Sequence, residues 1–173
     1  RAVMAILVTQ IAAAAAGVSW MFVEWMLRGR PSLLGLISGA VGGLVVITPA
    51  SGFVGPVAAL VMGLIGGVCC FWGAVFLKRM AGWDDSLDAF GVHGVGGIVG
   101  ALLTGVFASS AVTGSEMNPV MTQVGIQTAS VVATMVYAGA VSWILLKIID
   151  VVMGLRVTSD EERMGLDLSL HGE

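Results

Sequence analysis

Residues 84–100 read DDSLDAFGVHGVGGIVG. The stretch opens with Asp84, Asp85 and Ser86, which are residue types preferred at helix N-caps, and acidic side chains there are favoured by the positive end of the helix dipole. It continues with apolar residues and glycines around a single histidine, His93. Capping is the simplest role for the three polar residues at its start. The stretch therefore predicts the beginning of an apolar helix that carries an ionisable side chain.

The composition of the whole chain is that of a membrane protein. Of its 173 residues, 57% are hydrophobic and 11% are charged, and the mean hydropathy is +0.98. Soluble domains carry about 25% charged residues, and this chain has too few to cover its apolar surface in water. Its 25 glycines agree, because small residues let membrane helices pack closely. The net charge of −3 excludes a basic nucleic-acid-binding surface.

Five stretches have the roughly 20 mostly apolar residues that a membrane span requires. They are residues 2–27, 33–54, 57–77, 87–108 and 120–153. The expected fold is therefore all-α, a polytopic transmembrane helical bundle over residues 1–154, followed by a solvated tail over residues 155–173. The last stretch is longer than a span requires, so we expect it to be tilted or to extend beyond the bilayer.

The basic residues predict the orientation of these spans. The loops at one side of the predicted spans contain no Lys or Arg. The basic residues fall at the ends that alternate to the other side, and they are Arg28, Arg30, Lys78, Arg79, Lys147, Arg156 and Arg163. The positive-inside rule then places the C-terminus in the cytoplasm. Glu24 and Trp25 are expected to be interfacial anchors. Because the chain starts at Arg1 inside an apolar stretch, without a signal-peptide pattern, we expect an N-terminal portion to be absent.

His93 is expected near the middle of the bilayer. It follows Asp84 by nine residues, which is roughly 13 Å at 1.5 Å per residue, within a hydrocarbon core of about 30 Å. At 100° per residue, the smallest side chains share its face: Ala89, Gly96, Gly97, Gly100 and Thr104. This stripe is either a helix-packing face or a space for a small permeating molecule. We favour the second, because ionisable residues inside a membrane usually mark functional sites.

Two further polar positions have open roles. Thr48 precedes Pro49, so its hydroxyl either lines a path or satisfies a carbonyl that the proline leaves free. Asp88 is a cap, a partner for a basic residue, or part of a vestibule that attracts cations. No nucleophile with a partner base, no metal-ligand cluster and no cofactor motif accompanies His93. The chain is therefore expected to be no enzyme, with no metal and no cofactor.

These residues resemble the ammonium transporter family, the Amt/Mep/Rh proteins, and the match is closer to the bacterial Amt branch than to the Rh glycoproteins. The long motif of residues 84–100 carries most of the resemblance. Further segments extend it across the chain: GRPSLLG at 29–35, GLVVITPA at 43–50, GLRV at 154–157, GLD at 165–167 and HGE at 171–173. Members have eleven spans, of which the first ten form two inverted repeats around a pore in each subunit of a homotrimer. The resemblance implies that this chain is the C-terminal part, spans seven to eleven with the cytoplasmic tail.

The resemblance also implies roles for individual residues. His93 would be the second of two paired pore histidines, with Thr48 and Ala89 beside the pore and Asp88 near its cytoplasmic half. Ammonium would lose its proton and cross as NH3 through an apolar, histidine-lined pore of the cell (inner) membrane. The first histidine and the outer gate would lie in the N-terminal half.

The tail resembles the family's regulatory segment. Arg156, Asp167 and His171 would then contribute to regulation, with a PII-type signalling protein as the partner at the cytoplasmic face. Two other functions stay open for the same fold, an ammonium sensor and a broader gas channel.

Overall fold

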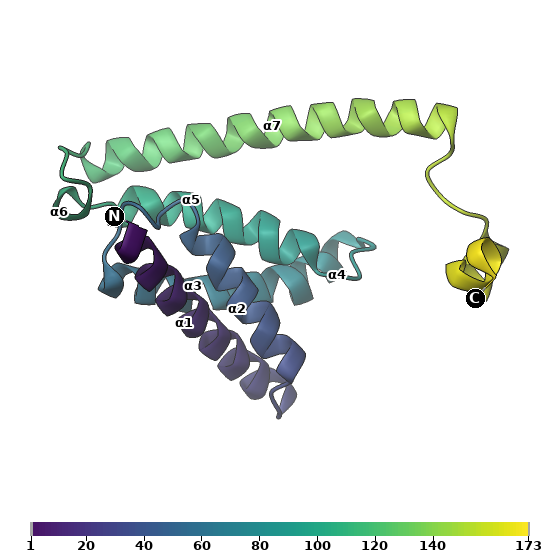
Figure 1. Cartoon of the computed structure of the whole chain (residues 1–173), viewed down its shortest axis with the longest axis horizontal. Coiled ribbons are helices and arrows are strands. Elements are labelled where there is room, and N and C mark those ends of the chain that lie inside the picture. Colours follow the sequence, from purple (N-terminus) through teal and green to yellow (C-terminus); the bar gives the residue numbers. More distant parts are fainter. Residues whose placement is uncertain (1, 173) are drawn as a thin grey trace. The chain divides into compact units, whose positions relative to one another are not determined.

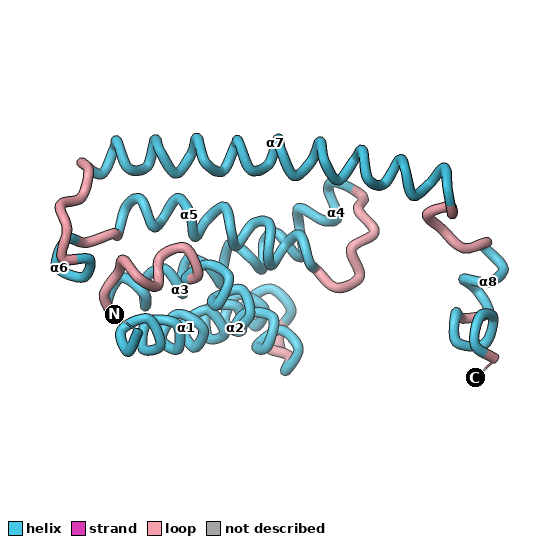
Figure 2. Tube along the Cα trace, turned by 45° about the horizontal axis from the view of Figure 1, so that its top comes forward, coloured by secondary structure: helices cyan, strands magenta, loops and turns pink. Residues whose placement is uncertain are grey.

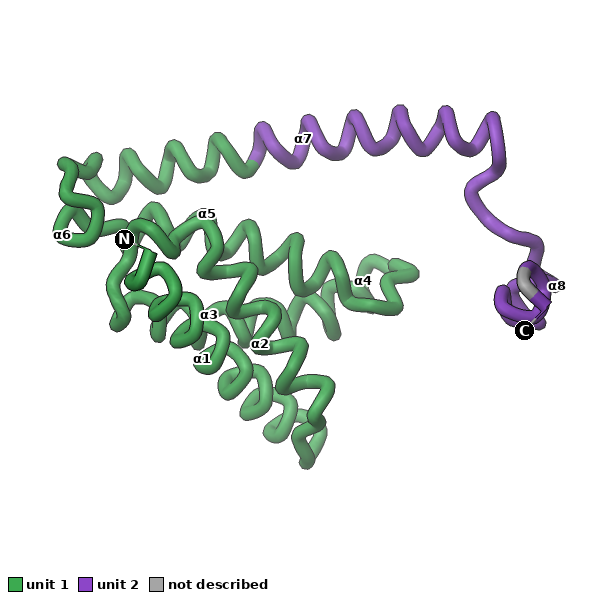
Figure 3. The backbone as a smooth tube through the Cα atoms, in the orientation of Figure 1, with its two compact units in different colours: residues 1–131 green, residues 132–173 purple. Residues whose placement is uncertain are grey.

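The computed structural model describes residues 2–172, and for His171 it describes the backbone only. Within this part of the chain the regular structure is entirely helical, as Figures 1 and 2 show, so the expected all-α class is confirmed. The helices form two compact units, residues 1–131 and 132–173, with the division inside helix α7 (Figure 3). Each unit is described by itself.

The first unit is a bundle of apolar helices. It contains α1 (Ala2–Arg28), α2 (Leu33–Ile47), α3 (Pro56–Trp72) with its continuation through the π-helix η1 (Gly73–Leu77) and α4 (Lys78–Ala81), the π-helix η2 (Phe90–Gly94), α5 (Val95–Phe107), α6 (Ser110–Thr113) and the start of α7 (Val120–Val152). The second unit contains the rest of α7, then α8 (Ser159–Met164) and the π-helix η3 (Asp167–His171).

Four of the described helices are long and apolar enough to cross a membrane. They are Ala2–Arg28, the continuous helix Pro56–Ala81, Phe90–Phe107 and Val120–Val152. The stretch expected as a span over residues 33–54 is instead a shorter apolar helix, Leu33–Ile47, followed by turns. Fifteen residues are about 22 Å of helix, and Pro49 explains why the helix goes no further, since proline has no N–H to donate.

Local sequence signals set the other helix ends. Gly29 adopts a φ of +75° directly after α1, a conformation that glycine adopts without the Cβ clash of other residues. Ser32 then caps α2, and its side chain accepts a hydrogen bond of 3.0 Å from the Gly35 N–H. Pro56 begins α3, where its missing N–H costs nothing.

Helix α1 packs between α2 and α3 through glycines. A Cβ atom at Gly43 of α2 or at Gly63 of α3 would lie 2.5 Å from the carbonyl oxygen of Ala12. Such backbone contacts are the way membrane helices gain packing energy where lipid is as apolar as the side chains. Larger side chains fill the remaining core, among them Val8, Ile47, Met62 and Phe71.

Candidate functional site

The helix that carries His93 begins at a capped break in the chain. Residues 82–88 are not helical, and the Asp85 carboxylate accepts hydrogen bonds from the N–H groups of Ala89 (2.8 Å) and Phe90 (2.9 Å). Capping by the acidic residues at the start of this stretch is therefore confirmed for Asp85. The first helical residue is Ala89, two residues later than the sequence predicted.

The His93 side chain lies on an open face of this helix. Its immediate neighbours Gly91 and Val92 are buried, whereas His93 and Ala89 are exposed. One turn further on, a Cβ atom at Gly97 would meet nothing within 4 Å. Ala89, His93 and Gly97 therefore lie along one uncovered side of the helix, which we call the open row.

The remaining small residues of the expected stripe form a second, packed row. Gly96, Gly100 and Thr104 are buried. A Cβ atom at Gly100 would lie 2.2 Å from the carbonyl oxygen of Val46 in α2, and the Thr104 hydroxyl donates to the Gly100 carbonyl at 2.7 Å. The single stripe that the sequence predicted is thus two rows, one that packs against a neighbouring helix and one that is free of such contacts in the described chain.

Thr48 satisfies the backbone that Pro49 disrupts. Its hydroxyl donates to the Leu44 carbonyl at 2.6 Å, while its own N–H is bonded to Val45 at 3.2 Å instead of to Leu44. Of the two roles that the sequence allowed, the carbonyl-satisfying one is therefore present. The residue is also exposed, so its oxygen still has a lone pair available to accept a hydrogen bond.

Asp88 has a basic partner and a constrained backbone. Its carboxylate accepts a hydrogen bond of 2.5 Å from the Lys78 ammonium. Its φ of +54° is in the left-handed region, which aspartate tolerates better than most side chains. Among the roles considered for Asp88, that of partner for a basic residue is the one that its contacts support.

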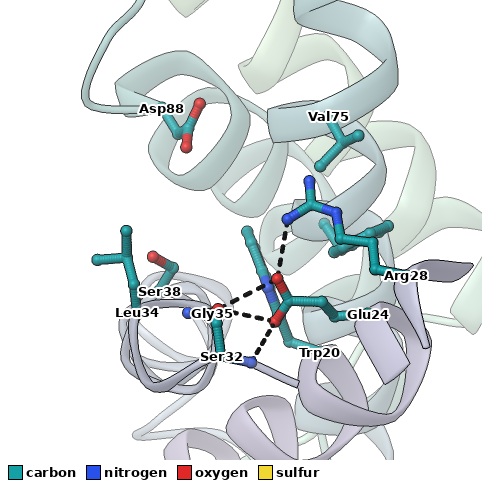
Figure 4. Close-up of a pocket in the computed structure, with 10 residues that line it drawn as sticks. Trp20, Glu24, Arg28, Ser32, Leu34, Gly35, Ser38, Val75 and Asp88 are labelled. Carbon is teal, nitrogen blue, oxygen red and sulfur yellow. Dashed lines mark hydrogen bonds and ion pairs between the residues drawn. The ribbon is translucent and has the colours of Figure 1, made fainter. Parts of the chain in front are cut away.

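Glu24, which the sequence predicted to be an interfacial anchor, is a buried carboxylate that lines the same cavity as Asp88. Glu24 is 3% exposed, so it is no interfacial anchor. It accepts hydrogen bonds from Arg28 (2.8 Å) and from the Ser32 N–H (3.0 Å), and it lines a cavity of about 90 Å³ together with Asp88 and Ser38 (Figure 4). Buried carboxylates require such partners. The signal in the sequence was the four-residue spacing of Glu24 and Arg28 on one helix face.

The second unit holds the three tail residues that the resemblance singled out. Arg156 donates two hydrogen bonds to Glu162, at 2.7 and 3.3 Å, and this guanidinium lowers the pKa of the Glu162 carboxyl. Asp167 is exposed at the start of η3. His171 ends η3, and its side chain lies outside the described residues. The structure does not bring these three residues together through any contact between described atoms.

The fold and these rows define the class of protein: a multi-pass membrane protein built from apolar helices that pack through glycines. Among the described residues, no three His, Cys, Asp or Glu side chains are grouped so that they could hold a metal ion. Beyond its class, the chain belongs to the Ammonium Transporter Family, whose family model matches residues 1–173. Since this is a family of transporters, the expectation that the chain is no enzyme is confirmed.

Individual relatives agree with this membership. The chain is 43% identical to a Bacillus subtilis (strain 168) protein named ammonium transporter, covering 99% of this chain and 44% of that protein. It is 46% identical to an Aquifex aeolicus ammonium transporter, covering 99% of this chain and 41% of that protein. The chain thus spans about two fifths of the length of these relatives.

Solved structures share the fold. The crystal structure of Saccharomyces cerevisiae Mep2 has a TM-score of 0.83 at 38% identity, covering 92% of this chain and 38% of that one. A structure described as a sensor Amt protein has a TM-score of 0.88 at 34% identity, covering 96% of this chain and 41% of that one.

Proposed function

We propose that this chain forms the C-terminal five membrane spans and the cytoplasmic tail of an ammonium transporter, with His93 as one of its pore histidines. One observation carries the proposal: an exposed imidazole lies on the open row of an apolar helix whose neighbouring row of small residues is packed. A polar ring facing lipid is costly. The open row is therefore the face that the rest of a longer protein would enclose, leaving a path beside the ring.

The chemistry of this row suits ammonia. Moving a bare cation into an apolar passage costs many kcal/mol, so losing a proton before crossing is the cheaper route. A neutral imidazole has one N–H and one lone pair, so it can both donate to and accept from ammonia. Ala89 and Gly97 leave space on either side of His93, and Thr48 offers a further hydroxyl. The names of the relatives support ammonium as the substrate.

The remaining assignments of the proposal concern topology and partners. The positive-inside pattern supports a membrane region over residues 1–154, with the cytoplasmic C-terminus at the end of residues 155–173 in a cell (inner) membrane. Asp88 would lie near the cytoplasmic mouth. We include a homotrimer and regulation of the tail by a PII-type protein, through Arg156, Asp167 and His171, on the strength of the family resemblance alone.

The test is His93→Ala in the full-length protein, reconstituted into proteoliposomes. Ammonium-dependent current and methylammonium uptake should fall, or potassium should begin to permeate, because the ring that selects the crossing species is gone. Leu64→Ala removes an exposed apolar side chain of α3 and serves as the control for expression and folding. Unchanged currents together with unchanged rejection of potassium would exclude a pore role for His93.

One observation favours a second candidate, an ammonium sensor: the solved structure with a TM-score of 0.88 is described as a sensor Amt protein. A sensor would bind ammonium without sustained flux. Proteoliposomes separate the two functions, since a transporter accumulates labelled methylammonium, whereas a sensor changes its tryptophan fluorescence on ammonium addition and takes up none.

A further inference from the structure

The turn that carries His93 is a π-turn, and a second π-turn lies against it. Two apolar helices of the first unit widen in this way, η1 at Gly73–Leu77 and η2 at Phe90–Gly94. A π-turn has an i→i+5 hydrogen-bond pattern, is rare, and is found frequently at functional sites. In η2 the Val95 N–H accordingly bonds to the Phe90 carbonyl.

The two π-turns touch through glycine backbones. A Cβ atom at Gly91 would lie 2.4 Å from the Ala74 nitrogen and 2.6 Å from its Cα. From the other side, a Cβ atom at Gly73 would lie 3.0 Å from the Gly91 carbonyl oxygen and 3.1 Å from its Cα. Because the neighbours of Gly91 are all backbone, that position has no room for a side chain unless the two turns separate. At Gly73 the nearest atom is a Val95 methyl at 2.9 Å, so a side chain there requires a smaller shift.

Polar contacts hold the same pair of turns on either side of the glycines. The Cys70 thiol, fully buried one turn before η1, donates to the Val92 carbonyl at 3.6 Å, and this carbonyl belongs to the peptide that leads into His93. Lys78, the first residue after η1, donates to the Asp85 carbonyl at 2.6 Å and to the Asp88 carboxylate. The middle of η2 and the segment just before it are thus tied to the helix that contains η1.

We propose that the contact between Gly73 and Gly91, together with the hydrogen bond from the Cys70 thiol, is a positioning device that sets the direction of the His93 side chain. A π-turn inserts one residue, and one residue is about 100° of rotation in an α-helix. If η2 relaxed to an α-helix, its residues would turn by up to about that angle relative to α5, and the imidazole would no longer face the uncovered side of the helix. The contact with η1 keeps the wider turn and therefore keeps the ring in line with Ala89 and Gly97.

The test measures side-chain direction separately from transport. In the full-length protein, a thiol is introduced as His93→Cys, the partly buried Cys69 is changed to Ala, and the rate of labelling by methyl methanethiosulfonate is measured. Adding Gly91→Ala should lower this rate by about tenfold or more, in proportion to the smaller fraction of molecules with position 93 in the open row. Gly63→Ala is the matched control, since its Cβ meets the Ala12 carbonyl at 2.5 Å in a contact far along the helix from η1.

Further variants keep the proposal falsifiable if Gly91→Ala does not fold. Gly73→Ala makes a milder clash and should lower the labelling rate in the same direction. Cys70→Ala should also lower it, whereas Cys70→Ser keeps a donor for the Val92 carbonyl and should restore it. The proposal would be overturned if the Gly91, Gly73 and Cys70 variants were labelled as fast as the His93→Cys protein without them. It would also be overturned if Gly63→Ala lowered the labelling rate as much as those variants do.

The part of this inference that concerns transport rests on the proposed function, and the two can fail separately. If His93→Ala leaves uptake intact while the glycine variants slow labelling, the positioning device exists but the pore role does not. If His93→Ala abolishes uptake while the glycine variants label and transport normally, the pore role stands and the positioning device is refuted.

Discussion

Adjacent glycine rows on the His93 helix should respond in opposite ways to the same substitution. At Gly100 a new Cβ would lie 2.2 Å from the Val46 carbonyl oxygen, about 1 Å closer than the C···O contacts of packed helices. Overpacking of this kind costs about 1–3 kcal/mol, partly offset by the roughly 1 kcal/mol by which alanine exceeds glycine in helix propensity. At Gly97 nothing lies within 4 Å, so only the propensity gain remains.

The two variants should therefore differ by about 1–3 kcal/mol in stability. At roughly 2–4 °C per kcal/mol for a domain of 150–250 residues, thermal unfolding of the purified full-length protein in detergent resolves the difference. Gly100→Ala should lower the midpoint and Gly97→Ala should keep or raise it. Gly97→Leu then tests function: if the open row lines a path, uptake is lost while the midpoint holds.

The refuting result is a drop in the unfolding midpoint for Gly97→Ala as large as that for Gly100→Ala. Such a drop would mean that another part of the full-length protein packs tightly onto Gly97. The open row would then be a second packing face, and His93 would be a residue that bonds a neighbouring helix instead of one beside a path.

Other substitutions test single contacts. Thr48→Val should lower stability by about 1 kcal/mol, because the Leu44 carbonyl loses its hydrogen-bond donor inside the bilayer. Thr48→Ser keeps the hydroxyl and should retain both stability and uptake. A stable Thr48→Val variant with unchanged uptake would contradict this role of the Thr48 hydroxyl. Arg28→Ala should lower the unfolding midpoint more than Glu24→Gln, because it leaves the Glu24 carboxylate, which is 3% exposed, buried without its charged partner, a loss of about 3–5 kcal/mol at most. Equal midpoints would contradict this pairing. Arg156 lowers the pKa of Glu162, so this contact stabilises the tail at pH values above the ordinary glutamate pKa, and the stabilisation is lost as the pH falls through the lowered pKa. In Arg156→Gln, ¹³C-carboxyl NMR should show a higher pKa for Glu162. An unchanged Glu162 titration would refute the pairing.

The sequence could predict those features that depend on residues close together in the chain. Composition and span length indicate a membrane bundle, and Asp85 marks the start of the His93 helix at a position that typical caps occupy. Pro49 likewise signals where α2 ends, although the expected span continued to residue 54. These features need no knowledge of what lies opposite each helix.

Features that depend on a neighbouring helix could not be predicted from the sequence. Helical periodicity gives the angle between Gly97 and Gly100, but it does not say that Val46 lies against one of them and nothing against the other. Glu24 has the same sequence spacing to Arg28 as any surface ion pair, and only the return of the chain through Ser32 buries it. The contact between the two π-turns could not be predicted for the same reason, since Gly73 and Gly91 meet only where the two helices pack together.

The division into two rows also removes a conflict between the two interpretations of the stripe. A helix in a membrane needs a close backbone contact to hold its place, whereas a histidine beside a path needs an uncrowded face. Because the two rows are offset by one residue, Gly96 and Gly100 supply the contact, and Ala89 and Gly97 leave His93 free. The glycine-rich motif is therefore used for both purposes at once, and a substitution in either row should separate stability from transport.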